Sequence, residues 1–77
     1  MPICRSATVQ ERLNEALAFR NMRQIELSRA TGIPRDSISH YTRGAAIPSL
    51  ERIHLMSVAL DVSEIWLLGY NLPMLDK

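Results

Sequence analysis

The short stretch from Gly32 to Pro34 is the strongest constraint on how this chain can fold. Glycine just beyond a helix adopts the left-handed backbone conformation without the steric cost of a Cβ atom. Proline fixes its own φ at a value suited to the start of a helix and disfavours helical geometry at the preceding residue, Ile33. We therefore predict that one helix ends at Gly32 and that a second begins near Arg35, after a sharp turn.

Helical periodicity flanks this turn on both sides. On a wheel that advances by about 100° per residue from Arg35, the second helix has a polar side and an apolar side. The polar side holds Arg35, Asp36, Ser39, His40 and Arg43, and the apolar side holds Pro34, Ile38 and Tyr41. The expected apolar face of the first helix consists of Ile25, Leu27, Ala30 and Thr31. An isolated helix of this kind usually has only a solvated outer face, but two short helices joined by a tight turn indicate a helix-turn-helix.

Small, apolar and turn-forming residues keep a fixed spacing over most of the chain. They are Arg12-Leu13, Gln24-x-x-Leu27-Ser28-x-x-x-Gly32-Ile33-x-x-x-x-Ile38-Ser39, Gly44-x-x-x-Pro48-Ser49 and Ala59-Leu60-x-Val62-x-x-x-Trp66-Leu67-x-Gly69. In this spacing the chain resembles the Cro and phage-repressor (XRE-type) family of DNA-binding domains, from about Arg12 to Gly69. Any one of these residues alone would be a weak signal, and the specificity lies in their common register.

Three departures accompany the resemblance. Ser28 stands where the family usually has alanine, at a close approach of two helices. Arg23 and Pro34 stand at helix-cap positions that usually hold Ser or Thr, so a capping hydrogen bond of about 1 kcal/mol must be replaced or forgone. Leu17 and Thr42 stand where family members often pair Arg with Glu. Because both partners are missing together, no charge is left without its counterpart.

The resemblance implies an all-α fold, a compact five-helix bundle of the lambda-repressor type, that inserts the helix from Arg35 to Arg43 into the major groove of double-stranded DNA. On the same basis Arg35, Asp36 and His40 occupy base-reading positions, with Ser39 beside them. Arg35 would favour guanine, and Asp36 could accept a hydrogen bond from cytosine N4. Asp36 could equally cap the helix or orient Arg35.

The resemblance also implies contacts outside the base-reading positions. Gln24 and Arg43 would bind phosphates. The carboxy-terminal end of the family's domain forms a two-fold dimer contact, and a short helix cannot bury every apolar residue found there. The candidate dimer-interface residues are Ile65, Leu67, Leu68 and Tyr70, whereas Trp66 is expected to complete the core. We therefore expect a transcriptional regulator, a phage-type or bacterial repressor, that binds a palindromic operator as a homodimer.

Three further helices are expected around the helix-turn-helix. The first runs from about Thr8 to Arg20, with Glu11 three residues after the cap and Asn21 closing it in the left-handed conformation. Its inward residues are Val9, Leu13, Ala16 and Leu17. A fourth helix begins at Pro48 or Ser49, ends near Asp61 and turns Ile53, Met56, Ser57 and Leu60 inward; a short fifth begins at Ser63 and ends at Gly69. We assign residues 1–7 to an N-terminal arm, 8–69 to the domain, and 70–77 to a tail or linker.

Length and charge bound the classes of protein that fit. With 77 residues and 47% hydrophobic content, the chain makes one small domain near the lower limit for a self-supporting core. The single Cys4 cannot form an intrachain disulfide, and no export signal or membrane-spanning run is evident, so we expect a cytoplasmic protein. The net charge is only +1. However, residues 20–43 carry five arginines against two carboxylates, while residues 44–77 are net negative, so the positive end is the helix-turn-helix end.

Enzymatic and metal-binding functions find little support in the sequence. His40 and His54 have no Cys or carboxylate at ligand spacing, and Ser39 and His40 are adjacent helix residues that do not face one another. We expect no enzyme, no cofactor and no metal site. The alternative to a DNA-binding regulator is a protein-interaction module on the same fold, such as an antitoxin or an assembly adaptor.

Overall fold

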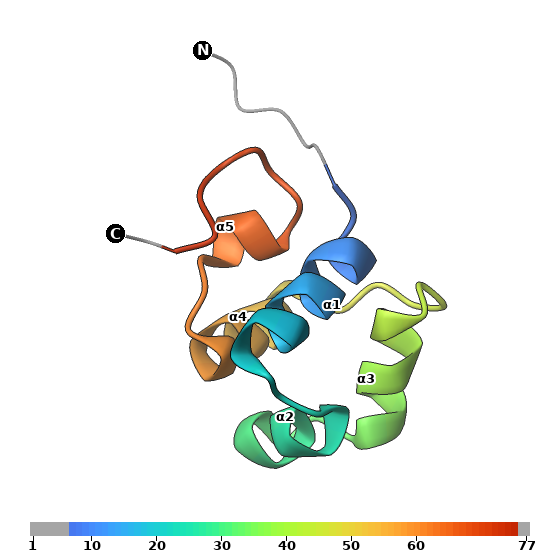
Figure 1. Ribbon diagram of the computed structural model, residues 1–77. Coiled ribbons are helices and arrows are strands. Elements are labelled where there is room, and N and C mark those ends of the chain that lie inside the picture. The colour runs from blue at the N-terminus through green and yellow to red at the C-terminus, as the bar shows by residue number, and fades with distance from the viewer. Residues whose placement is uncertain (1–6, 76–77) are drawn as a thin grey trace.

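Residues 7–75 fold into five helices, as a computed structural model describes them (Figure 1). In chain order these are α1 (Val9–Arg20), α2 (Gln24–Thr31), α3 (Arg35–Thr42), α4 (Leu50–Leu60) and α5 (Glu64–Leu67). No β-strand occurs between residues 7 and 75, which confirms the predicted all-α class. Residues 1–6 of the predicted arm and residues 76–77 of the predicted tail lie outside the described residues. Within the described range, no helix is long and apolar enough to span a bilayer.

Helix α1 begins and ends where its local sequence predicts. The Thr8 hydroxyl accepts a hydrogen bond from the Glu11 backbone N–H at 3.2 Å, and the Glu11 carboxylate accepts one from the Thr8 N–H at 3.0 Å. This reciprocal capping box satisfies two backbone donors that the first helical turn leaves without partners. At the other end Asn21 adopts a left-handed conformation with φ of 53°. The four residues predicted to face inward, Val9, Leu13, Ala16 and Leu17, are all buried.

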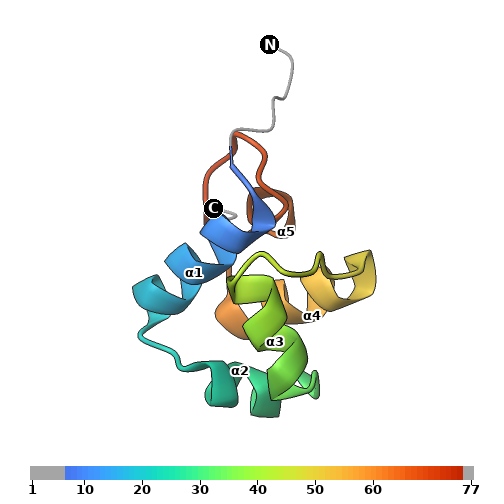
Figure 2. The ribbon, with the colours of Figure 1, turned by 90° about the vertical axis from the view of Figure 1, so that its right-hand side faces the viewer.

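The core lies where α1 and α4 meet the other three helices. Helix α1 contacts α3, α4 and α5, while α2 packs against α3 and α4. Helix α2 therefore lies at the opposite end of the domain from α5 in both views (Figures 1 and 2). The largest fully buried side chains are Leu13, Leu27, Ile38, Ile53, Met56, Leu60 and Leu67. Trp66 is buried as predicted, and the Arg12 guanidinium carbon lies 4.7 Å from the centre of its ring.

Helix α2 buries less than its periodicity predicts. Leu27 is its only buried residue, whereas Ile25 and Ala30 are exposed and Thr31 is half-buried. An eight-residue helix that packs on two neighbours through one narrow side has no room to bury a broader face. Pro34 was also expected on the apolar side of α3, but it is exposed at the N-terminus of that helix.

Serine caps start the last two helices, and the chain after α5 stays against the domain. The Ser49 and Ser63 hydroxyls accept hydrogen bonds from the backbone N–H groups of Arg52 and Trp66. The Ser63 backbone N–H donates to the Met74 carbonyl at 2.6 Å, and the Met74 side chain packs on the core. The chain after α5, expected as a tail or linker from residue 70, thus contacts the bundle as far as Met74.

Gly32 provides a test of the turn between α2 and α3. Its φ is +79°, and a Cβ atom placed there would meet no atom within 4 Å, so the requirement for glycine is one of backbone strain alone. We expect Gly32→Val to lower the free energy of unfolding by about 2 kcal/mol, because a β-branched residue disfavours positive φ. Urea denaturation measures this loss. Gly32→Asn is the control and should lose less, since asparagine tolerates the left-handed region; wild-type stability in the valine variant would contradict the prediction.

Glu11 gives the α1 cap a pH dependence. Hydrogen bonds from the Thr8 backbone and hydroxyl hold the pKa of its carboxyl below the usual 4.5. A group whose pKa falls on folding stabilises the protein above its unfolded pKa and loses that contribution as the pH falls through the folded pKa. We expect wild type to be more stable than Glu11→Gln at neutral pH, with the difference fading below about pH 4.5. Thermal melts across this range measure it, and a pH-independent difference would show that the carboxylate charge is not involved.

Candidate nucleic-acid interface

Helix α3 lies on the outside of the domain with one side packed and the other open, as the view onto it in Figure 2 shows. Its packed side consists of Ile38, Tyr41 and Thr42, which are buried against the bundle. Arg52 of α4 donates a hydrogen bond to the Tyr41 hydroxyl at 2.8 Å, so the polar end of this core residue is also satisfied. Because these three side chains face the bundle, the opposite side of α3 must face solvent.

The turn between α2 and α3 is held by hydrogen bonds from the end of α2. The Ser28 hydroxyl donates to the Ile33 carbonyl at 2.6 Å, and the Thr31 hydroxyl accepts from the Ile33 N–H at 3.2 Å. The Ile33 side chain itself is buried. The serine that departs from the family's usual alanine thus has a defined contact within the turn. At the start of α2, the Glu26 carboxylate accepts a hydrogen bond from the Arg23 N–H at 2.9 Å. This is one of the two hydrogen bonds of a capping box, and it forms although Arg23 has no capping hydroxyl.

The open side of α3 carries the residues predicted to read bases. Arg35, Asp36 and His40 are exposed and Ser39 is half-buried. In a helix, side chains four positions apart lie one above the other, so Arg35 stands by Ser39 and Asp36 by His40. Among residues 7–75, the side chains of Arg35, Asp36 and His40 form no hydrogen bond or ion pair. The alternative in which Asp36 pairs with Arg35 is not the arrangement seen.

The two residues predicted to bind phosphates flank this surface. The Gln24 side chain, at the first position of α2, donates from Nε2 to the Thr42 hydroxyl at 3.1 Å. Arg43 follows α3 and donates from Nε to the Ser39 carbonyl at 3.3 Å, so its side chain lies back along the helix. The Gln24 contact joins α2 to the end of α3. No local sequence pattern predicted this contact.

One of the five arginines between residues 20 and 43 has a different role. Arg20 donates from Nε to the Leu60 carbonyl and from its terminal nitrogen to the Asp61 carbonyl, both at 2.7 Å. It therefore caps the C-terminus of α4, where a cation also interacts favourably with the helix dipole. The other four, Arg23, Arg29, Arg35 and Arg43, are exposed on the helix-turn-helix.

The candidate dimer surface requires one correction. Leu67 is 0% exposed and belongs to the core, so the prediction that it contacts a partner is wrong. Ile65 is 48% exposed, and Leu68 and Tyr70 are half-buried. A four-residue helix presents its successive side chains to different sides, and Leu67 points inward together with Trp66.

Exposed apolar residues also occur on α4, and the local sequence did not lead us to expect them. Leu50 and Val58 are 70% and 66% exposed. They lie one turn to either side of His54, whose Nδ1 is 2.7 Å from the Glu64 carboxylate of α5. The His54–Glu64 contact therefore joins the exposed side of α4 to the start of α5. The four-residue spacing of Leu50, His54 and Val58 is the sequence signal that places these residues on one side of α4.

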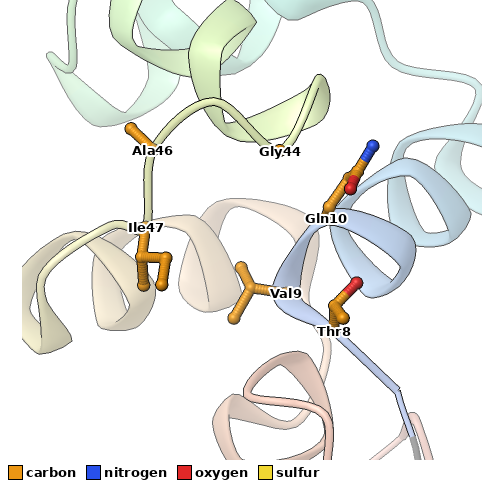
Figure 3. A pocket seen from close by; sticks show the side chains of 6 residues that line it. All are labelled: Thr8, Val9, Gln10, Gly44, Ala46 and Ile47. Atoms are coloured by element: carbon orange, nitrogen blue, oxygen red, sulfur yellow. The ribbon is translucent and has the colours of Figure 1, made fainter.

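The hollow beside the start of α1 has neither the size nor the charged side chains typical of a small-molecule site. A hollow of about 200 Å³ lies between the start of α1 and the loop after α3, lined by Thr8, Val9, Gln10, Gly44, Ala46 and Ile47 (Figure 3). It is smaller than the roughly 300 Å³ at which small-molecule pockets begin, and no charged side chain lines it. Within residues 7–75, no group of three His, Cys, Asp or Glu side chains could hold a metal ion.

Two short helices, a left-handed glycine turn and an outward polar second helix define the class: this is a helix-turn-helix domain. A family model described as helix-turn-helix matches residues 15–67, and the chain belongs to this family. Over 56 residues, or 73% of its length, the chain is 38% identical to "HTH-type transcriptional regulator PrtR" of Pseudomonas aeruginosa. It spans about a fifth of the length of that regulator, 22%.

Proposed function

We propose that this domain is a sequence-specific, double-stranded DNA-binding transcriptional regulator that reads the major groove with α3. The observation that supports this most is the open side of α3, where Arg35, Asp36 and His40 have no side-chain hydrogen bond or ion pair within residues 7–75. Polar side chains left without partners on a rigidly packed helix are available to a ligand. The likeness to a named transcriptional regulator points in the same direction.

Each residue of α3 takes a role that follows from its chemistry. The Arg35 guanidinium presents two parallel donors that match O6 and N7 of guanine, and the Asp36 carboxylate accepts from cytosine N4. His40 and Ser39 lie one turn further along the same side and offer donors and acceptors to the next base pairs. Gln24 and Arg43 bind phosphates on either side of the groove and set the position of α3 without reading sequence.

Selection of bound duplexes from a random DNA pool tests this function directly. We expect a preferred sequence to emerge and its affinity to fall steeply as salt rises, because phosphate binding releases counterions. The test uses the chain without any other protein. No enrichment, combined with capture of a protein partner through the α3 surface, would instead indicate the interaction-module function of an antitoxin or adaptor.

We propose further that the domain binds DNA as a homodimer through Ile65, Leu68 and Tyr70, together with Leu50 and Val58. Each of these apolar side chains is at least partly exposed, Leu50 and Val58 on α4 and the other three in or just after α5. A two-fold contact there would give the site dyad symmetry, as in a phage-type repressor with a palindromic operator. The patch is small for a stable interface, so we expect the dimer to form mainly on DNA.

The division between base-reading and phosphate-binding residues can be tested with two arginine variants. Arg35→Ala should weaken binding to the selected site by roughly 1 to 3 kcal/mol and relax the preference at one base pair per half-site. Arg43→Ala should weaken binding to all sequences alike and lower the salt slope by about one unit. Fluorescence anisotropy on selected and random duplexes measures both. Arg35→Ala should keep the wild-type melting temperature, and Arg43→Ala should lower it only slightly, because it removes one exposed hydrogen bond to the Ser39 carbonyl. Exchanged binding phenotypes would mean that α3 docks in the opposite sense.

The dimer can be tested with a charge at its proposed centre. Ile65→Glu should weaken binding to a full palindromic site, because two carboxylates would face each other across the two-fold axis. Binding to a single half-site should be unchanged, which controls for folding and for the DNA contacts of α3. Full sites should have half-sites about 34 Å apart. A selected site without dyad symmetry, bound by one protein per duplex, would refute the dimer.

A further inference from the structure

Thr42 joins three helices through hydrogen bonds. It is the last residue of α3 and is 7% exposed. Its hydroxyl accepts from Gln24 Nε2 of α2 at 3.1 Å and donates to the Ser39 carbonyl at 3.0 Å. Its own carbonyl accepts from Asn14 Nδ2 of α1 at 2.8 Å. The start of α2 and the end of α3 are therefore tied to each other and to α1 at one residue.

The number of protons available fixes the orientation of the Gln24 amide. A threonine hydroxyl has a single proton, and that of Thr42 is committed to the Ser39 carbonyl. Gln24 must therefore present its NH2 group, and not its carbonyl oxygen, to Thr42. An amide NH2 has two protons, so one N–H of Gln24 remains without a partner among the described residues. Gln24 is only half-buried, which leaves that donor open to a ligand.

We propose that Thr42 is a positioning residue for DNA binding. Its hydroxyl holds the Gln24 amide in the orientation in which the free N–H of that amide meets a backbone phosphate. The inference rests on the proposed function, because it specifies how one predicted phosphate contact is aimed. If the Thr42 hydroxyl were absent, Gln24 would rotate freely and could turn its carbonyl oxygen toward the anion. The same hydroxyl couples the phosphate contact to the C-terminal end of the recognition helix.

A double-mutant cycle between Thr42 and Gln24 tests the proposal, with a random-sequence duplex as the probe because the contact is to phosphate. Thr42→Val removes the hydroxyl and keeps a similar shape. We expect it to weaken binding about fivefold, the fold-change typical of one hydrogen bond. Gln24→Ala should have a similar effect, and the double variant should bind no more weakly than Gln24→Ala alone. Thr42→Ser retains the hydroxyl and should bind within about twofold of wild type.

Two readouts separate positioning from a general structural effect. The salt slope should not change in Thr42→Val, since no charge is lost, whereas Arg43→Ala should lower it. Losses that add in the double variant, or a Thr42→Val protein that binds like wild type, would overturn the role of Thr42 while leaving the proposed function intact. A wild-type chain that binds no duplex would instead overturn the proposed function.

A measurement on the wild-type chain keeps the proposal testable even if Thr42→Val fails to fold. The two protons of the Gln24 side-chain amide give separate NMR signals. We expect one to be protected from exchange in the free protein, through its bond to Thr42, and the other to shift when the random-sequence duplex is added. A Gln24 amide that does not respond to the duplex would overturn the proposal.

Discussion

The burial of one side of α3 is the constraint on which the rest of the surface depends. An eight-residue helix is too short to be stable alone, so packing must fix both its existence and its rotation. Ile38 is fully buried, and Tyr41 is held at its hydroxyl by Arg52. Once these residues point inward, Arg35 and His40 must point outward. The polar chemistry of the proposed DNA-reading side of α3 is thus set by the apolar contacts on its opposite side.

The contact between α1, α2 and α3 is built without charges. Leu17 and Thr42 occupy positions where related domains often pair Arg with Glu, and here Leu17 joins the core while Thr42 bonds to two amides. A buried ion pair is costly to desolvate and strongly destabilising when one partner is lost. Among the described residues, no buried side-chain nitrogen or oxygen lacks a hydrogen-bond partner. The two amide contacts of Thr42 thus tie α1, α2 and the end of α3 together without an ion pair.

Local signals predicted most of the fold, because a cap or a turn is decided by a few neighbouring residues. The Thr8 cap with Glu11 and the left-handed Asn21 and Gly32 are of this kind. Contacts between distant residues could not be predicted, such as Arg20 with the Leu60 carbonyl, 40 residues away. The inward orientation of Leu67 also depends on how the short α5 packs, which its own sequence does not determine.

The distribution of charge in space explains how a domain with a net charge of only +1 can approach a polyanion. Charges in physiological salt act over about 8 Å, so a phosphate responds to the nearest side chains and not to the total. Arg23, Arg29 and Arg43 are exposed on the helix-turn-helix, whereas Asp61 and Glu64 lie outside it, at the end of α4 and in α5. Since Arg20 is drawn to the C-terminus of α4, the positive end depends on fewer arginines than the sequence count implies. If the domain binds DNA as proposed, each of the remaining arginines should therefore contribute a larger share of the attraction.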